Sequence, residues 1–182
     1  KDLIELYDQF WKQNGGNIKQ GIIEDKENRK LLAKISKWKS SKDKGEKFHS
    51  FEEYLERKKP NQTQIYYFAG DDLKLMLENP VLKGLNAKGY EVILCPEPFD
   101  EVVLKELDKY EEIQLTNIGQ SSFQIPQEDS EVKMEKRVSA YYEPLTKWVK
   151  ELLKEDVENV SMKFYNEEDA LVVVASDKGY SA

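Results

Sequence analysis

The sequence predicts an α/β protein with three successive parts: a helical segment, a small layered α/β unit and an incomplete third unit, at residues 1–60, 61–129 and 130–182. Apolar residues of the first part recur at helical spacing. Strand and helix patterns alternate in the second part, which predicts a small parallel sheet covered by helices. The third part combines a helical pattern with two strand patterns.

The composition narrows the function classes. The 182 residues include 28 Lys and Arg and 35 Asp and Glu, for a net charge of -7, and basic residues alternate with acidic ones instead of forming a stripe. We therefore expect no nucleic-acid partner, because phosphate contacts need clustered positive charge. No apolar run reaches the roughly 18 residues of a membrane helix, so we expect no membrane partner. One cysteine, Cys95, and one histidine, His49, cannot supply a disulfide framework or an ordinary zinc site.

The first part predicts three helices. A stripe that begins at Leu3 defines the first, which we expect to stop at Gly15 and Gly16 because glycine ends helices at low cost. Asp25 is the expected cap of a second helix, whose apolar face includes Trp38. A polar and mobile loop is then expected at residues 40–45.

The third helix begins with a capping box. Ser50 and Glu53 have the spacing at which each side chain binds a free backbone N–H in the other residue's turn. Core packing is the expected role of the tryptophans and tyrosines on these helices.

The second part supplies the sheet. β-branched and aromatic runs predict strands, and Asn79 followed by Pro80 predicts a helix start. Cys95 ends a buried type of strand, so we expect it to be inert. In order, the expected elements are strand 65–69, helices 73–77 and 80–89, strand 90–95, helix 99–107 and strand 113–118.

Four carboxylates follow two of these strands: Asp71, Asp72, Glu97 and Asp100. Ligands of parallel sheets collect at the carboxyl ends of strands, and carboxylates bind Mg2+ there. This arrangement favours an alternative function, a stand-alone α/β module with a Mg2+-assisted phosphoryl-transfer site. The sequence has no glycine-rich phosphate loop to support it, and carboxylates after strands also cap helices.

The third part begins with an expected exposed connection at residues 127–136. A helical stripe follows at residues 138–153, in which Pro144 predicts either a kink or the true first turn. Residues 160–165 and 170–175 predict a hairpin with its turn at 166–169. One helix and one hairpin make a small core, so we expect this unit to be incomplete.

Short stretches along nearly the whole chain also carry a family resemblance. They are Phe10-Trp11-Lys12, residues 17–25, residues 28–34, Ser40-Ser41, Ile65-Tyr66-Tyr67, Gly89-Tyr90-Glu91-Val92-Ile93 and residues 97–101. Together, in this order, they resemble the middle region of the heat-shock protein 90 chaperones. Residues 142–148 are similar to the endoplasmin-like branch of that family.

The resemblance implies a more specific domain map. Residues 1–60 would be the helical coil of the middle domain, residues 61–129 its small α/β/α layer, and residues 130–182 the start of an α+β C-terminal dimerisation domain. The implied function is that of a segment of an ATP-dependent, homodimeric chaperone. Such a segment would contribute client binding and would couple the ATPase domain to the dimerisation domain, with co-chaperones as further partners.

The resemblance also implies where the chemistry lies. The family binds ATP and Mg2+ in an N-terminal domain, and the arginine that reaches the ATP phosphate would precede Lys1. We therefore expect no catalytic, cofactor-binding or metal-binding residue in this chain. Tyr180 stands where relatives have an aromatic residue on a client-holding surface, and it is the one candidate site residue; packing on the rest of the dimerisation domain is its alternative role.

The resemblance implies that the protein is located in the lumen of the endoplasmic reticulum, with a mitochondrial or plastid paralogue as the alternative. Asn61 and Asn159 each begin a glycosylation sequon, which a secretory lumen would permit, although such triplets are common by chance.

Overall fold

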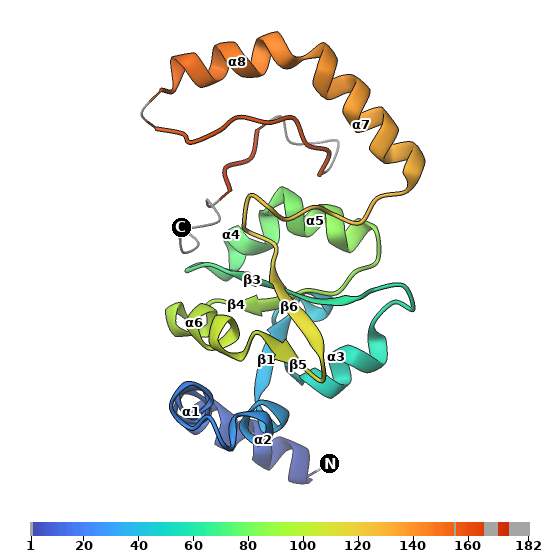
Figure 1. Ribbon diagram of the computed structural model, residues 1–182. Helices are drawn as coiled ribbons and strands as arrows, with labels where there is room; N and C mark the ends of the chain where they lie inside the picture. Colours follow the sequence, from blue (N-terminus) through green and yellow to red (C-terminus); the bar gives the residue numbers. More distant parts are fainter. Residues whose placement is uncertain (1, 155, 166–170, 175–182) are drawn as a thin grey trace.

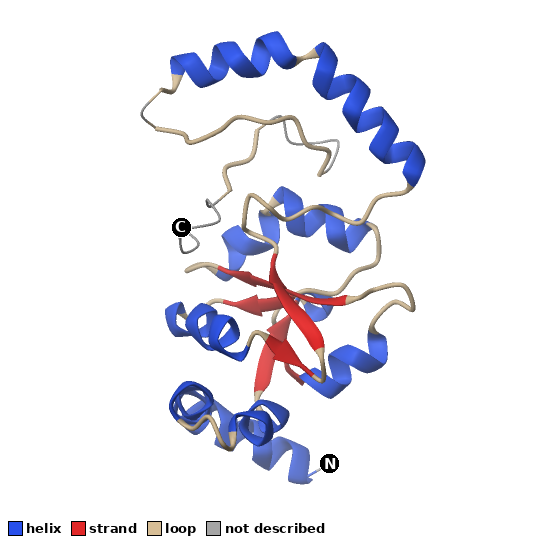
Figure 2. Ribbon diagram, in the orientation of Figure 1, coloured by secondary structure: helices blue, strands red, loops and turns tan. Residues whose placement is uncertain are grey.

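A six-stranded mixed sheet forms the centre of the molecule, with helices on both of its faces (Figures 1 and 2). The computed structural model describes residues 2–154, 156–165 and 171–174. The strand order is β2-β1-β4-β3-β6-β5. The strands are β1 (Lys37–Ser40), β2 (Phe48–Ser50), β3 (Gln64–Ala69), β4 (Ile93–Cys95), β5 (Lys109–Tyr110) and β6 (Ile113–Asn117).

The predicted parallel sheet is confirmed at the centre. Strand β3 pairs in parallel with both β4 and β6, and the remaining pairs are antiparallel. The helices are α1 (Asp2–Glu24), α2 (Arg29–Ile35), α3 (Phe51–Arg57), α4 (Leu73–Glu78), α5 (Pro80–Ala87), α6 (Pro98–Leu107), α7 (Asp129–Tyr141) and α8 (Glu143–Leu152), with a short 3-10 helix, η1 (Ser41–Asp43). The predicted α/β fold class is confirmed.

Strand β3 divides the core into two clusters. Successive side chains of a strand point to opposite faces. Ile65 and Tyr67 accordingly lie in a cluster that includes residues of α1, α3 and α6. Tyr66 and Phe68 lie in a second cluster that includes residues of α4 and α5. The sheet is therefore covered on both faces, as parallel strands require.

The predicted stop at Gly15 and Gly16 is wrong, because α1 continues through both glycines to Glu24. The indole of Trp11 packs over Gly15: a Cβ on that glycine would lie 2.8 Å from Trp11 Cε2. Nothing lies within 4 Å of a Cβ on Gly16. Gly15 thus serves side-chain packing inside the helix rather than its termination.

The two glycines supply a matched test of this interpretation. We expect Gly16→Ala to raise the free energy of unfolding by about 0.5–1 kcal/mol, because alanine loses less backbone entropy in a helix. Gly15→Ala should lower it instead, because the buried Trp11 ring must move. Urea denaturation followed by circular dichroism measures both variants. Equal stabilisation by the two substitutions would show that the Trp11 contact has no influence.

Trp38 was predicted on a helix and lies in β1. Helix α2 ends earlier, at Ile35, and the extended backbone of Ser36 leads the chain into the strand. The predicted polar loop after it is also wrong at its start. Ser41 is buried, donates its N–H to the Val92 carbonyl at 2.8 Å and accepts the Val92 N–H on its hydroxyl at 3.0 Å. These two hydrogen bonds extend the pairing of β1 by one residue beyond its end at Ser40.

The caps of the early helices were predicted with mixed success. The capping box is confirmed, with Ser50 N donating to Glu53 Oε2 at 2.7 Å and Glu53 N donating to Ser50 Oγ at 3.2 Å. Asp25 does not cap α2 itself, because Asn28 holds the cap position. Instead, Asp25 Oδ1 accepts the Asn28 N–H at 3.0 Å and fixes the turn that precedes the helix.

The third part differs most from expectation. Helix α7 occupies most of the predicted connection at 127–136, stabilised by a second capping box in which Glu128 N donates to Glu131 Oε2 at 2.8 Å. Pro144 lies in the first turn of α8, which is one of its two predicted roles. Neither residues 160–165 nor residues 171–174 form strands, and the predicted turn lies outside the described residues. The three domain boundaries stay a prediction.

Candidate functional site

The four carboxylates predicted to follow the strands do not act together. Asp72 caps α4, because its Oδ1 accepts the Lys74 N–H at 2.7 Å, and Asp71 beside it is exposed. Glu97 and Asp100 lie at the start of α6 and bind Lys19 of α1. In the part of the chain that the structure describes, no group of three or more His, Cys, Asp or Glu side chains could hold a metal ion.

The Lys19 ammonium occupies the position beside Glu97 and Asp100 that a bound metal ion would take. Lys19 Nζ lies 2.5 Å from Asp100 Oδ1 and 3.2 Å from Glu97 Oε2. The side chains of Lys19 and Asp100 are 5% and 3% exposed, whereas that of Glu97 is 60% exposed. The ammonium also lies 4.8 Å from the centre of the Trp38 ring. This cluster joins α1 to α6 through charge and to β1 through the indole.

Burial and charge compete in this cluster. Burial disfavours the Asp100 carboxylate more than Lys19 favours it, so the pKa of Asp100 is raised to about 6. Burial lowers the pKa of Lys19, but the charges and hydrogen bonds of Asp100 and Glu97 outweigh it, so the pKa of Lys19 is raised. Lys19 therefore remains a cation.

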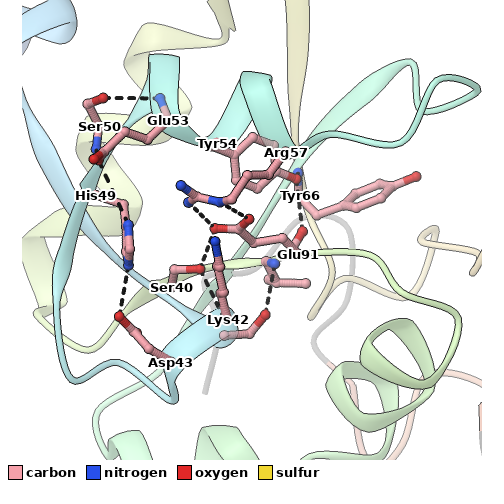
Figure 3. A network of polar contacts seen from close by, with 12 residues as sticks. Ser40, Lys42, Asp43, His49, Ser50, Glu53, Tyr54, Arg57, Tyr66 and Glu91 are labelled. Atoms are coloured by element: carbon pink, nitrogen blue, oxygen red, sulfur yellow. Dashed lines mark hydrogen bonds and ion pairs between the residues drawn. The ribbon is translucent and has the colours of Figure 1, made fainter.

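A second polar network surrounds Glu91 and ties α3 to the sheet (Figure 3). Glu91 accepts Arg57 Nε at 2.8 Å and Arg57 Nη2 at 2.6 Å, the bidentate geometry that favours arginine over lysine. Ser40 Oγ donates to the same carboxylate at 2.6 Å. Glu91 precedes β4, so this network fixes α3, β1 and the entry to β4 relative to one another.

The phenol of Tyr54 continues this network into the core. Its oxygen donates to the Glu91 carbonyl at 2.9 Å and accepts Gln62 Nε2 at 2.8 Å and the Tyr66 N–H at 3.1 Å. Burial raises the pKa of Tyr54. The Tyr54 phenol therefore stays neutral and has a structural role. It donates and accepts hydrogen bonds but would not release its proton near neutral pH.

Cys95 is buried, as predicted, and burial raises its pKa well above the ordinary thiol value. A thiol in that environment is a weak nucleophile. The prediction that it is inert therefore agrees with its surroundings.

Helix α8 carries an exposed apolar surface, which we call the α8 face: Leu145, Trp148 and Leu152, at 48%, 58% and 67% exposure. Neither α7 nor α8 has a buried residue among those described. The sequence predicted this stripe but not its exposure. Contiguous apolar groups on a surface mark contacts with other protein segments. Tyr180, the predicted client-binding residue, lies outside the described residues.

No helix in the described ranges is long and apolar enough to cross a membrane.

Comparisons with known proteins place the chain in one family. The family model described as Hsp90 protein covers residues 1–182. The chain is 33% identical to an endoplasmin homologue of Arabidopsis thaliana over 177 residues, which is 97% of this chain and 21% of the relative. It is 35% identical to an endoplasmin homologue of Caenorhabditis elegans over 178 residues, 96% of this chain and 23% of the relative. The chain thus spans about a fifth of the length of these relatives.

A solved structure agrees with these sequence matches. The middle domain of a Plasmodium falciparum heat shock protein is 32% identical, with a TM-score of 0.57, over 60% of this chain and 46% of that one. The predicted family resemblance and its endoplasmin-like character are confirmed. The chain belongs to the heat-shock protein 90 family.

Proposed function

We propose that this chain is the middle-to-C-terminal segment of an ATP-dependent, homodimeric chaperone, where it binds partly folded clients and couples the ATPase domain to the dimerisation domain. The family membership supports the chaperone role. The observation that carries the client-binding part is the α8 face, because partly folded chains expose apolar side chains that such a surface can cover.

The two polar networks support the coupling role. Lys19 joins α1 to α6, and Arg57 with Glu91 joins α3 to the sheet. Both pairs lie mostly away from solvent, where charge pairs hold their geometry more firmly than at an exposed surface. Helices fixed in this way would move with the sheet as one body, which is what force transmission between neighbouring domains requires.

ATP and Mg2+ would bind outside this chain, and the endoplasmin homologues favour the endoplasmic-reticulum lumen over a mitochondrion or plastid. Co-chaperones and a second copy of the full-length protein are the further proposed partners. A Mg2+-assisted phosphoryl-transfer module is disfavoured, because Lys19 is paired with Glu97 and Asp100 and Asp72 caps a helix.

Client holding is tested by the thermal aggregation of citrate synthase, followed by light scattering. We expect Trp148→Ala to weaken suppression by about fivefold or more, since a central aromatic anchor commonly contributes over 1 kcal/mol to binding. Lys150→Ala, an exposed charge on the same helix, is the matched control and should leave suppression unchanged.

Tyr180→Ala is compared in the same assay, in the full-length protein. We expect weaker holding with little loss of thermal stability, because a tyrosine suits loose contact through its apolar ring and polar tip. A loss of about 3–5 kcal/mol, typical of a core aromatic, with unchanged holding per folded molecule would assign Tyr180 to packing instead. Unchanged holding in Trp148→Ala would remove the α8 face from the proposal.

A further inference from the structure

The chain after α8 returns toward the α/β unit (Figure 1), and the main chain at Tyr165 lies against Gly84 of α5. A Cβ on Gly84 would lie 2.1 Å from the Tyr165 carbonyl oxygen and 2.8 Å from Ile125 Cδ1. No side chain larger than glycine fits under that carbonyl. Gly84 is buried in the middle of α5, where an alanine would otherwise stabilise the helix. The glycine therefore permits a close approach of another backbone to the helix.

Side chains hold the crossing segment on both sides of this contact. Tyr165 and Val172 pack against the core cluster that contains Leu82 and Leu85. Lys163 Nζ lies 3.4 Å from Glu135 Oε1 of α7. Burial raises the pKa of Tyr165, which agrees with a phenol withdrawn from water.

The receiving surface, which we call the Gly84 seat, consists of Gly84, Gln124, Ile125, Gln127 and Glu135. Four of these residues line one small hollow with Lys163, Phe164 and Tyr165: Gln124, Ile125, Gln127 and Glu135. Gly84 lies beside this hollow, next to Ile125, and meets main chain there. The hollow's lining has amides and a carboxylate, groups of the kind that bind main-chain or charged groups. Main-chain contact is independent of sequence, so such a seat suits many peptides.

The occupying segment itself has the character of an unfolded chain. Residues 160–165 and 171–174 form no strand, and Leu171 and Val173 are 84% and 91% exposed. Only Tyr165 and Val172 are described as packed on the core from this segment. So few buried side chains would hold the segment weakly, and its release would uncover the seat.

We propose that the Gly84 seat binds extended peptides that carry an aromatic residue, and that residues 163–165 of this chain occupy it as an internal competitor. The proposal deepens the client-binding role above and rests on it, with a second surface separate from the α8 face. A tethered competitor acts at a high effective concentration, so an external peptide would bind only to the fraction of molecules whose seat is open.

The test uses the whole chain and a fluorescein-labelled synthetic peptide with the sequence of residues 160–174. We expect Tyr165→Ala to tighten peptide binding by about tenfold, because weakening the internal segment raises the open fraction. Adding Gly84→Ala to that variant should weaken binding by about tenfold or more, since the Cβ blocks the backbone. Gly16→Ala is the matched control and should leave the affinity unchanged.

A second measurement covers the case in which Gly84→Ala fails to fold. In the unmodified chain, saturating unlabelled peptide should displace the internal segment and speed trypsin cleavage after Lys163. Unchanged trypsin cleavage after Lys163, or a peptide affinity that Tyr165→Ala does not change, would contradict the proposal that the Gly84 seat binds peptides. Because citrate synthase holding is measured separately through Trp148, failure of the seat and failure of the chaperone role are distinguishable.

Discussion

Replacing Trp38 with alanine is expected to lower the free energy of unfolding by about 3–5 kcal/mol, the range for a deleted core aromatic. The side chain is 2% exposed and its ring centre lies 5.7 Å from that of Phe51. Its Nε1 donates to Ser36 Oγ at 2.8 Å, and Lys19 lies over its ring. The substitution would therefore leave a cavity between β1 and α3 and withdraw the ring that covers a buried ammonium. It would also remove one of the two hydrogen bonds of the buried Ser36 hydroxyl, which would still donate to the Ala33 carbonyl.

Trp148 provides the matched control. It is the same residue type at 58% exposure on α8, so Trp148→Ala should change stability by less than about 1 kcal/mol. Urea unfolding followed by far-UV circular dichroism avoids the loss of indole fluorescence in both variants. Similar losses of unfolding free energy at the two positions would show that Trp148 also packs on the core, against its exposure in the structure.

Trp38 also shows where the sequence misleads. Its spacing from Leu31 and Ile35 fits a helical face, yet the chain leaves the helix at Ser36. Strand β1 has four residues and β2 three; β1 pairs with β2 and with the distant β4, which joins both strands to the sheet. Short antiparallel strands of this kind have too few residues for a period of two to stand out. Long-range pairing, which is absent from any local window, decided the structure.

The predictions that succeeded depend on local rules. The capping box at Ser50 and the proline-led start of α5 need only their neighbours in sequence. The apolar run of β3 is continuous because both of its faces are covered, which made the central strand recognisable.

The acidic site failed for a different reason. Four carboxylates at strand ends could have met at one edge. Nothing in their spacing revealed that Lys19, some eighty positions earlier than Asp100, would pair with Glu97 and Asp100. The alternation of lysines with acidic residues in the first part favoured a solvated surface for every lysine. The burial of Lys19 between α1 and α6 depends on the tertiary structure, so only the fold revealed it.

Replacing Lys19 with methionine is expected to lower the free energy of unfolding by about 1–2 kcal/mol at pH 7, because the buried Asp100 carboxyl, deprived of its cationic partner, must be held protonated above its ordinary pKa range. Glu97 is exposed enough to be solvated, so its share of the loss is small. Methionine keeps the unbranched apolar stem of lysine and its packing beside Trp38, and lacks only the terminal ammonium position. The effect is therefore assigned to the ammonium and its partner rather than to a cavity.

The pH dependence identifies Asp100 as the source of that loss. Burial raises its pKa from 3.8 to about 6 in the folded chain, so the folded state takes up a proton more readily than the unfolded state. The stability linked to that proton is complete below about pH 4 and is lost as the pH rises through about 6. Without Lys19, which lowers this pKa, the carboxyl would stay neutral to still higher pH.

We therefore expect the difference in unfolding free energy between the original chain and Lys19→Met to shrink between pH 7 and pH 5, measured by urea denaturation at each pH. A second variant, Lys19→Met with Asp100→Leu, removes both charges from the interface of α1 and α6. It should recover to within about 1 kcal/mol of the original chain, since apolar replacements of buried ion pairs are often neutral or stabilising. A pH-independent loss, or a double variant no more stable than Lys19→Met alone, would mean that packing of the lysine stem, and not compensation of the Asp100 charge, holds α1 on α6.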